Sequence, residues 1–210
     1  MSITAGDLNS AVPLADLDFN GSQATLVNPS PPSRLVFSTP SPTNATLYLN
    51  SRPFFRVLTK NPASGSTKII DQVSGDVVST LKRRSLQPDT IQFKTRYDGR
   101  RILVRDWLKE RVDPDGKSMW IIETPVGAFA WRSDMAFRLV LTPETDSSQL
   151  IAWVELPGSE TGSNLALALT RGTESFWEEI VASFCFIEQK LRWKEKLHSR
   201  SVGKSMIIPM

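Results

Sequence analysis

Hydrophobic and polar residues alternate in short runs over most of the chain, which is the pattern of half-buried β-strands. Turn sequences such as Asp98-Gly99 and Pro157-Gly158 separate these runs. The pattern predicts about twelve strands, at 34–38, 45–49, 54–59, 67–71, 76–82, 90–94, 101–107, 117–123, 128–133, 137–142, 150–156 and 165–170. So many short strands at regular spacing are typical of an antiparallel barrel or sandwich.

Segment 176–197 has a different pattern and predicts one long C-terminal helix. Its middle, 180–187, is apolar apart from Ser183, whereas a surface helix carries a single apolar stripe. This run is too short to span a bilayer, which needs about 20 residues. We therefore expect the helix to lie inside a closed barrel. Ser175 and Glu178 fit a capping box at its start, and Trp193 would close the barrel mouth.

The chain of 210 residues fits one folded domain with extensions. Residues 1–33 carry acids, prolines and serines, which predict a loosely ordered lead-in. We expect residues 34–198 to form the β-barrel domain with its terminal helix, and residues 199–210 to form a tail. The start of the chain lacks the basic and apolar regions of a secretory signal. We expect an intracellular, cytoplasmic protein without a membrane span, able to associate peripherally with membranes.

Charge is distributed unevenly, although the net charge is only +3. Residues 1–33 contain three acids and no base, whereas 82–111 contain ten bases against four acids. Clustered bases can hold phosphate groups through charge-assisted hydrogen bonds and attract anionic lipid surfaces. Charge needed only for solubility is the more frequent reason for such a zone. The candidate anion-binding or lipid-binding residues are Lys82, Arg83, Arg84, Lys94, Arg96, Arg100, Arg101 and Arg105.

No motif indicates catalysis, and we predict no catalytic residue, metal ligand or cofactor. The single histidine, His198, lies at the end of the predicted helix, and the single cysteine, Cys185, lies in its apolar run. A nucleophilic dyad or a zinc site is therefore not expected. The sequence 113–116 reads as a proline-led turn, because a calcium loop needs further oxygen ligands at fixed spacings. Hydrolases that use carboxylates far apart in sequence remain an alternative.

Several segments resemble a fungal family known as domain of unknown function 6593. The terminal helix Trp177-Glu178-Glu179-Ile180-Val181-Ala182-Ser183-Phe184, continuing to Glu188-Gln189-Lys190, is similar to the acidic–apolar–basic helix of that family. Asp76-Val77-Val78, Val126-Gly127-Ala128-Phe129-Ala130-Trp131-Arg132 and the strand 150–155 add to the resemblance, which covers about 34–196.

That family is similar in layout to the group of tubby C-terminal, LURP-one and phospholipid-scramblase domains. The resemblance implies a closed barrel of about twelve strands around a buried hydrophobic helix. Tubby-type members bind phosphoinositides through basic surface residues, so lipid binding is a further implication of the resemblance.

These observations favour a non-enzymatic binding or scaffold protein that docks to anionic phospholipid headgroups through residues 82–105. A protein-interaction module is the alternative, with its basic face pairing to an acidic segment such as the chain's own residues 7–18. A hydrolase with dispersed carboxylates is a weaker third reading. Nucleic acid is disfavoured as a partner, because no aromatic stacking platform accompanies the bases.

Overall fold

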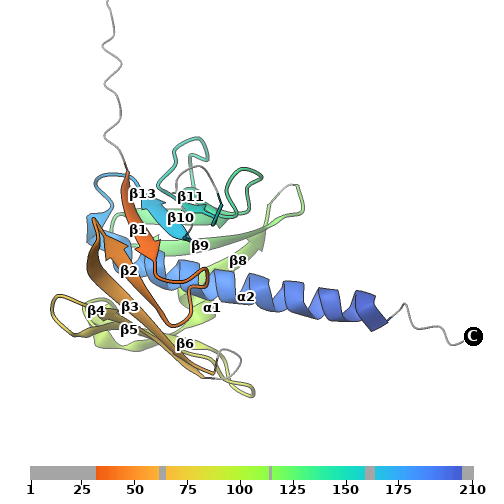
Figure 1. Cartoon of the computed structure of the whole chain (residues 1–210), viewed down its shortest axis with the longest axis horizontal. Coiled ribbons are helices and arrows are strands. Elements are labelled where there is room, and N and C mark those ends of the chain that lie inside the picture. The colour runs from red at the N-terminus through yellow and green to blue at the C-terminus, as the bar shows by residue number, and fades with distance from the viewer. Residues whose placement is uncertain (1–31, 62–64, 114, 159–163, 205–210) are drawn as a thin grey trace, which may run out of the picture.

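The computed structural model describes residues 32–61, 65–113, 115–158 and 164–204, with side chains up to 197. Its strands form one 13-stranded antiparallel sheet around a long C-terminal helix (Figure 1). The strands are β1 (Ser33–Phe37), β2 (Ala45–Leu49), β3 (Arg52–Lys60), β4 (Ser66–Asp71), β5 (Val77–Lys82), β6 (Thr90–Phe93), β7 (Arg101–Leu103), β8 (Leu108–Val112), β9 (Ser118–Thr124), β10 (Gly127–Arg132), β11 (Val140–Pro143), β12 (Ala152–Glu155) and β13 (Ala166–Leu169). The helices are α1 (Val104–Trp107) and α2 (Trp177–Lys204), and the 3-10 turns are η1 (Tyr97–Gly99) and η2 (Glu174–Phe176).

Strand order in the sheet is β7-β6-β5-β4-β3-β2-β1-β13-β12-β11-β10-β9-β8. The first and last strands in sequence, β1 and β13, pair in the middle, with Leu35 opposite Leu167. The two edges are β7 and β8, which are neighbours in sequence and joined by α1. Among the described residues no hydrogen-bonded pairing joins these edges, so the sheet is not closed by hydrogen bonds as the expected barrel would be.

The predicted strand 101–107 is wrong in its second half. Val104 and Trp107 are both buried, and residues three apart point to the same side only when the backbone makes a helical turn. The chain therefore leaves the sheet after Leu103 to form α1 and returns as β8, which the sequence analysis missed. In β8 only Leu108 is buried, because an edge strand that carries charges lacks the apolar alternation of an inner strand.

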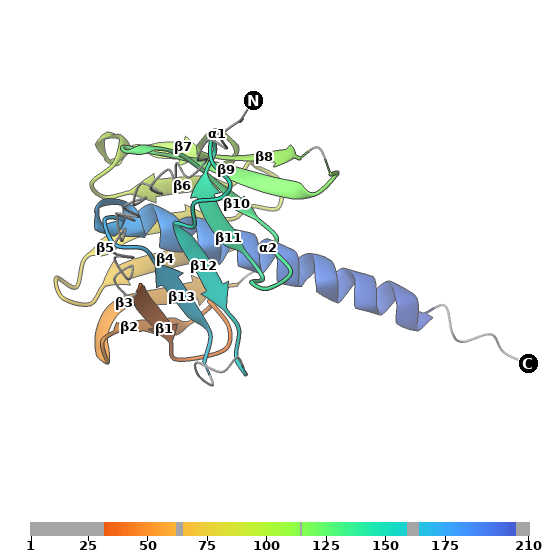
Figure 2. The same ribbon diagram turned by 90° about the horizontal axis from the view of Figure 1, so that it is seen from above.

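Helix α2 occupies the space that the sheet encloses and leaves it at one side (Figure 2). Every side chain from 180 to 189 is buried. Phe184 makes an edge-on contact with Phe37 at a centroid distance of 5.6 Å. The one hydroxyl in the apolar run is satisfied, because Ser183 Oγ accepts a bond from Trp131 Nε1 at 2.8 Å and donates to the carbonyl of Glu179 at 2.7 Å. The prediction of a buried helix is confirmed.

The ends of α2 differ from the prediction. The helix continues to Lys204 and projects from the sheet, and Trp193 is 50% exposed on the projecting part, so it does not close a mouth. At its start, α2 follows directly on η2, so Ser175 lies inside a helical turn instead of capping one. The carbonyl of Ser175 accepts a hydrogen bond from Arg96. In the described part of the chain, no helix is long and apolar enough to cross a membrane.

The enclosure of α2 leads to a stability prediction. Phe184→Asp would put an unpaired charge among aromatic side chains and should cost at least about 4 kcal/mol of unfolding free energy. Urea unfolding followed by tryptophan fluorescence measures this loss. Lys196→Asp, a charge change on the exposed part of α2, is the control and should leave the transition nearly unchanged. A Phe184→Asp protein as stable as the control would contradict the enclosure.

Candidate functional site

The eight bases singled out in the sequence form two groups at opposite ends of β5, β6 and β7. At one end of these strands, Lys82 of β5 is opposite Thr90 of β6, and Thr90 is opposite Leu103 of β7. At the other end Ser79 is opposite Phe93, and Gln92 is opposite Arg101. The first group therefore comprises Lys82, Arg83, Arg84 and Arg105, and the second comprises Lys94, Arg96, Arg100 and Arg101.

The second group lies beside the start of α2 and is largely matched by local carboxylates. Lys94 Nζ is 2.6 Å from Asp76 Oδ2, and its hydrogen bond and charge hold the pKa of Asp76 below its ordinary value. Arg96 Nε is 3.0 Å from Glu179 Oε1. Arg100 is 3.8 Å from Asp98 on the exposed turn. These contacts neutralise much of the charge that this group of bases was expected to offer to an anion.

The first group lies where α2 leaves the sheet. Arg83 is half-buried, with its guanidinium 4.9 Å from the ring centre of Phe186, and it donates a hydrogen bond to the carbonyl of Phe186 at 3.2 Å. Burial lowers the pKa of Arg83, and the negative charge of Asp89, which acts to raise that pKa, offsets this only in part. Arg84 is exposed and donates its backbone N–H to Asp89 at 3.1 Å. Two residues later Leu86 extends into solvent with 96% exposure.

The projecting part of α2 adds an apolar stripe on the same side. Phe186, Trp193 and Leu197 are seven and four residues apart, a spacing that puts them on one face of a helix. Because Phe186 faces Arg83, the half-exposed Trp193 and Leu197 continue outward from the place where loop 83–89 covers the helix. We name this side the exit surface and define it by Lys82, Arg84, Leu86, Trp193 and Leu197.

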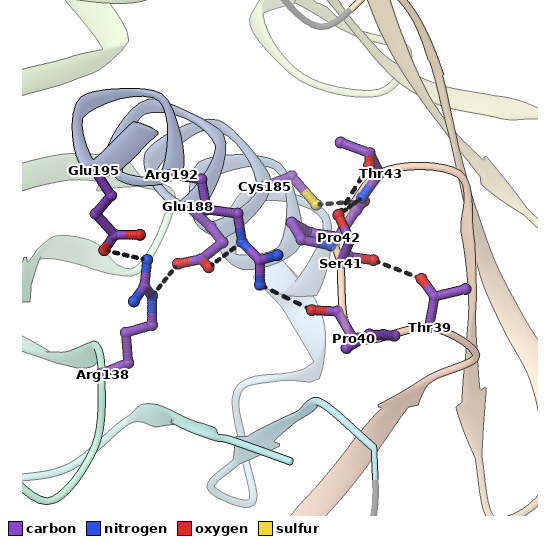
Figure 3. A network of polar contacts seen from close by, with 10 residues as sticks. All are labelled: Thr39, Pro40, Ser41, Pro42, Thr43, Arg138, Cys185, Glu188, Arg192 and Glu195. Atoms are coloured by element: carbon purple, nitrogen blue, oxygen red, sulfur yellow. Dashed lines mark hydrogen bonds and ion pairs between the residues drawn. The ribbon is translucent and has the colours of Figure 1, made fainter. Parts of the chain in front are cut away.

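A buried carboxylate fixes the opposite side of α2 at the exit (Figure 3). Glu188 is fully buried and accepts hydrogen bonds from Arg138 Nε at 2.7 Å and Arg192 Nε at 2.6 Å. Arg138 also bonds Glu195 at 2.8 Å, and Arg192 bonds the carbonyl of Pro40 at 2.8 Å. Burial alone would lower the pKa of Arg138, but the bonds and charges of Glu188 and Glu195 outweigh it and raise that pKa.

A second pair of acids lies near the start of α2. Glu179 is buried and bonded to Arg96, while Glu178 is half-buried beside it. Burial raises the pKa of both carboxyls, and for Glu178 the charge of Glu179 adds to the effect. The sequence analysis used Glu178 only as part of a capping box and did not foresee that burial would perturb either acid.

The buried acids do not form a pair of the glycosidase type. Glu179 and Glu188 are nine residues apart on one helix, about 13 Å along its axis, whereas an inverting pair is about 6.5–9.5 Å apart. Among the described residues, no group of three or more histidine, cysteine or acidic side chains could hold a metal ion.

A cleft of about 560 Å³ lies beside α1 and the edge strand β8, next to α2; we name it the seam cleft. Apolar side chains from four elements line it, namely Val104, Leu108, Trp120 and Phe186. Charged residues at the same cleft are Asp89, Arg105, Lys109, Glu110 and Lys190. Lys190 Nζ is 2.5 Å from Glu110 Oε2, and Lys109 pairs with Glu123. Of these residues the sequence analysis singled out only Arg105.

The residues missed by the sequence analysis gave weak signals. An isolated leucine in a polar loop, such as Leu86, carries no periodicity. Lys109 was counted among the bases of 82–111, but nothing in the sequence spacing indicated that β8 and α2 would bring it and Lys190 to one cleft. The i, i+4 pair of Trp193 and Leu197 was a usable signal for an apolar stripe.

The arginine clamp on Glu188 gives a testable prediction. Glu188→Gln should lower the unfolding free energy by about 3 kcal/mol, because it removes the buried negative charge and replaces one of the two oxygens that accept from the guanidinium groups with an N–H donor. Glu195→Gln changes the exposed end of the same network and should cost less than about 1 kcal/mol. Chemical denaturation of the two variants checks this ranking. Equal losses would contradict the central role of Glu188.

The raised pKa of Glu178 predicts a pH dependence. The folded state retains this proton above the ordinary value of 4.5, so the contribution of Glu178 to stability decreases as pH rises through the window between that value and the raised one. Glu178→Gln should therefore match the natural protein below pH 4.5 and become relatively more stable toward neutral pH. Denaturant titrations across this range measure the difference, and a gap independent of pH would contradict the assignment.

Comparison of the sequence with known proteins and protein families identifies the family of this chain. No curated protein and no solved structure matches the chain significantly. Residues 40–193, well over half of the chain, match the "Family of unknown function (DUF6593)". The matched region begins in the loop after β1 and includes the enclosed turns of α2 and Trp193. The chain therefore belongs to the family of unknown function DUF6593.

Proposed function

We propose that the chain is a non-enzymatic binding protein that docks on anionic phospholipid surfaces through its exit surface. The observation that carries this proposal is the coincidence of exposed apolar side chains with bases on one side of the molecule. Leu86 and the stripe of Trp193 and Leu197 are the apolar elements, and Lys82 and Arg84 lie beside Leu86 in sequence. A basic helix with one apolar face is suited to lie in the headgroup region of a bilayer.

The geometry supports a flat contact. The stripe and loop 83–89 belong to the same side of α2, so one plane can touch both while the helix lies parallel to it. Lys194 flanks the stripe with its side chain about half-exposed. Tryptophan at such a position favours the interface, because its ring is apolar and its N–H is polar. The bases supply the long-range attraction, and the apolar tips supply the short-range burial.

We also infer that the sheet and α2 form a filled barrel of the tubby-like layout. The support is the burial of all side chains from 180 to 189 and the bridging of β7 and β8 by α1. In this layout the interior holds the helix and leaves no central ligand cavity, so binding would use the outside. An intracellular location follows as part of the same proposal.

Co-sedimentation with vesicles tests the docking. Vesicles of phosphatidylcholine with phosphatidylserine or a phosphoinositide should pull down the protein at low salt and less at physiological salt, and pure phosphatidylcholine should not. Each base near an anionic leaflet contributes about 1 kcal/mol, so the double variant Lys82→Glu, Arg84→Glu should weaken binding at least about thirtyfold.

Arg100→Glu, Arg101→Glu is the matched control, because it changes the same charge at the other end of the strands. The pair Leu86→Ser, Trp193→Ser tests the apolar contribution and should reduce binding at physiological salt. Equal loss with the two charge variants would mean non-specific attraction and would overturn the assignment to the exit surface. Salt-sensitive binding to an acidic polypeptide, without binding to vesicles, would replace the lipid proposal with the protein-interaction alternative.

A further inference from the structure

The seam cleft combines features that point to a small ligand. Its volume of about 560 Å³ is within the usual range of small-molecule sites, which are mostly apolar with a few polar groups. The apolar lining comes from Val104, Leu108, Trp120 and Phe186, each buried against the core. The cleft follows from the topology, since α1 bridges the sheet edges here without a ladder of hydrogen bonds.

Trp120 provides an independent observation. This residue lines the cleft and is 2% exposed, yet its Nε1–H is buried without a hydrogen-bond partner in the described part of the chain. Trp107 Nε1 is likewise buried without a partner among the described residues, whereas two other buried indoles are satisfied: Trp131 donates to Ser183 and Trp177 donates to Thr173, both at 2.8 Å. Buried donors are normally paired, so the Trp120 indole lacks the acceptor that the other two have.

The charges at the cleft favour an acidic head group. Arg105, Lys109 and Lys190 outnumber Asp89 and Glu110 at the lining. The ion pairs of Lys109 with Glu123 and of Lys190 with Glu110 are partly exposed, and such pairs are weak enough to exchange partners. A ligand carboxylate can therefore take up these cations while an alkyl chain covers the apolar lining.

We propose that the seam cleft binds a single-chain anionic amphiphile, namely a fatty carboxylate. Its chain lies against Val104, Leu108 and Phe186, its carboxylate contacts Lys109 and Lys190, and a carboxylate oxygen accepts the indole N–H of Trp120. The site is distinct from docking on a bilayer, because it takes one free molecule from solution, and it does not depend on the exit surface.

A second cavity, of about 580 Å³, lies at the other end of α2 between loops and is lined by Phe129 and Phe176. Its lining contains one base, Arg171, and one acid, Glu144, which pairs with Arg111, and no orphaned indole lines it. A smaller cavity of about 400 Å³ is lined by the other unpartnered indole, Trp107, but its one base, Arg101, is outnumbered there by Asp106 and Glu123. Only the seam cleft, of these three cavities, combines an unpartnered indole with an excess of bases at its lining.

Titration of the full chain with dodecanoate, below the concentration at which it forms micelles and without vesicles, tests the proposal. Two-dimensional NMR of ¹⁵N-labelled protein resolves the indole N–H signals, and Trp120→Phe identifies the signal of Trp120 by its loss. Dodecanoate should shift the Trp120 signal and leave those of Trp131 and Trp177 in place. Calorimetry should give saturable binding with one molecule per chain.

Three comparisons make the result decisive. Dodecanol should bind at least about tenfold more weakly, because it lacks the charge that the lysines contact. The double variant Lys109→Gln, Lys190→Gln should lose a similar factor for dodecanoate but not for dodecanol. Lys68→Gln, a change at the exposed position of β4, is the control and should bind as the natural protein does.

Absence of dodecanoate binding would overturn the proposal, as would shifts confined to the bonded indoles. Equal affinity for dodecanol would overturn the role of the lysines. Because the assay contains no vesicles and the docking assay contains only two-chain lipids, either proposal can fail without the other.

Discussion

The burial of one continuous segment of α2 is the constraint on which the remaining structure depends. Ten successive side chains, from 180 to 189, are buried, so the sheet and its connections must surround the helix there. A flat sheet covers only one face of a helix. This chain therefore requires a sheet that has many strands and is strongly curled. Side chains from different strands on the inner face of the sheet line this space, as Phe37 from β1 and Trp131 from β10 do at Phe184.

Polar groups at the two ends of this segment set the position of the helix along its axis. Glu179 meets Arg96 at one end, and Glu188 meets Arg138 and Arg192 at the other. An apolar helix in an apolar sheath could slide or rotate with little change in burial, whereas a buried carboxylate has low energy only where its guanidinium partners lie. Ser183, bonded to Trp131, provides a third fixed point between them. These contacts hold the exit surface and the seam cleft in a defined relation to α2.

Much of the fold could be predicted from the sequence, because local patterns encode it. The apolar run around Phe184 is sufficient to indicate an enclosed helix, and alternation located most strands. Edge strand β8 was missed because Glu110 and Arg111 replace the apolar alternation there, and α1 was missed because Val104 fits a strand and a turn equally well. The site was less accessible. Partners such as Arg138 and Glu188 are 50 residues apart, and no local pattern tells whether Arg96 faces a carboxylate or solvent.

The pairing of β1 with β13 in the middle of the sheet has a consequence for how the chain is made. Leu35 meets a partner that is synthesised more than 130 residues later, at Leu167, and the helix that fills the interior follows after that. Strands β1 to β12 therefore leave the ribosome before the partner of β1, and before the helix that covers their apolar lining, have been made. Domains with such distant pairings fold slowly, and exposed apolar surface and unpaired strand edges promote aggregation. The nascent chain should thus rely on chaperones until α2 has emerged, and a truncation that removes the buried residues 180–189 of α2 should leave a sheet that cannot assemble its core.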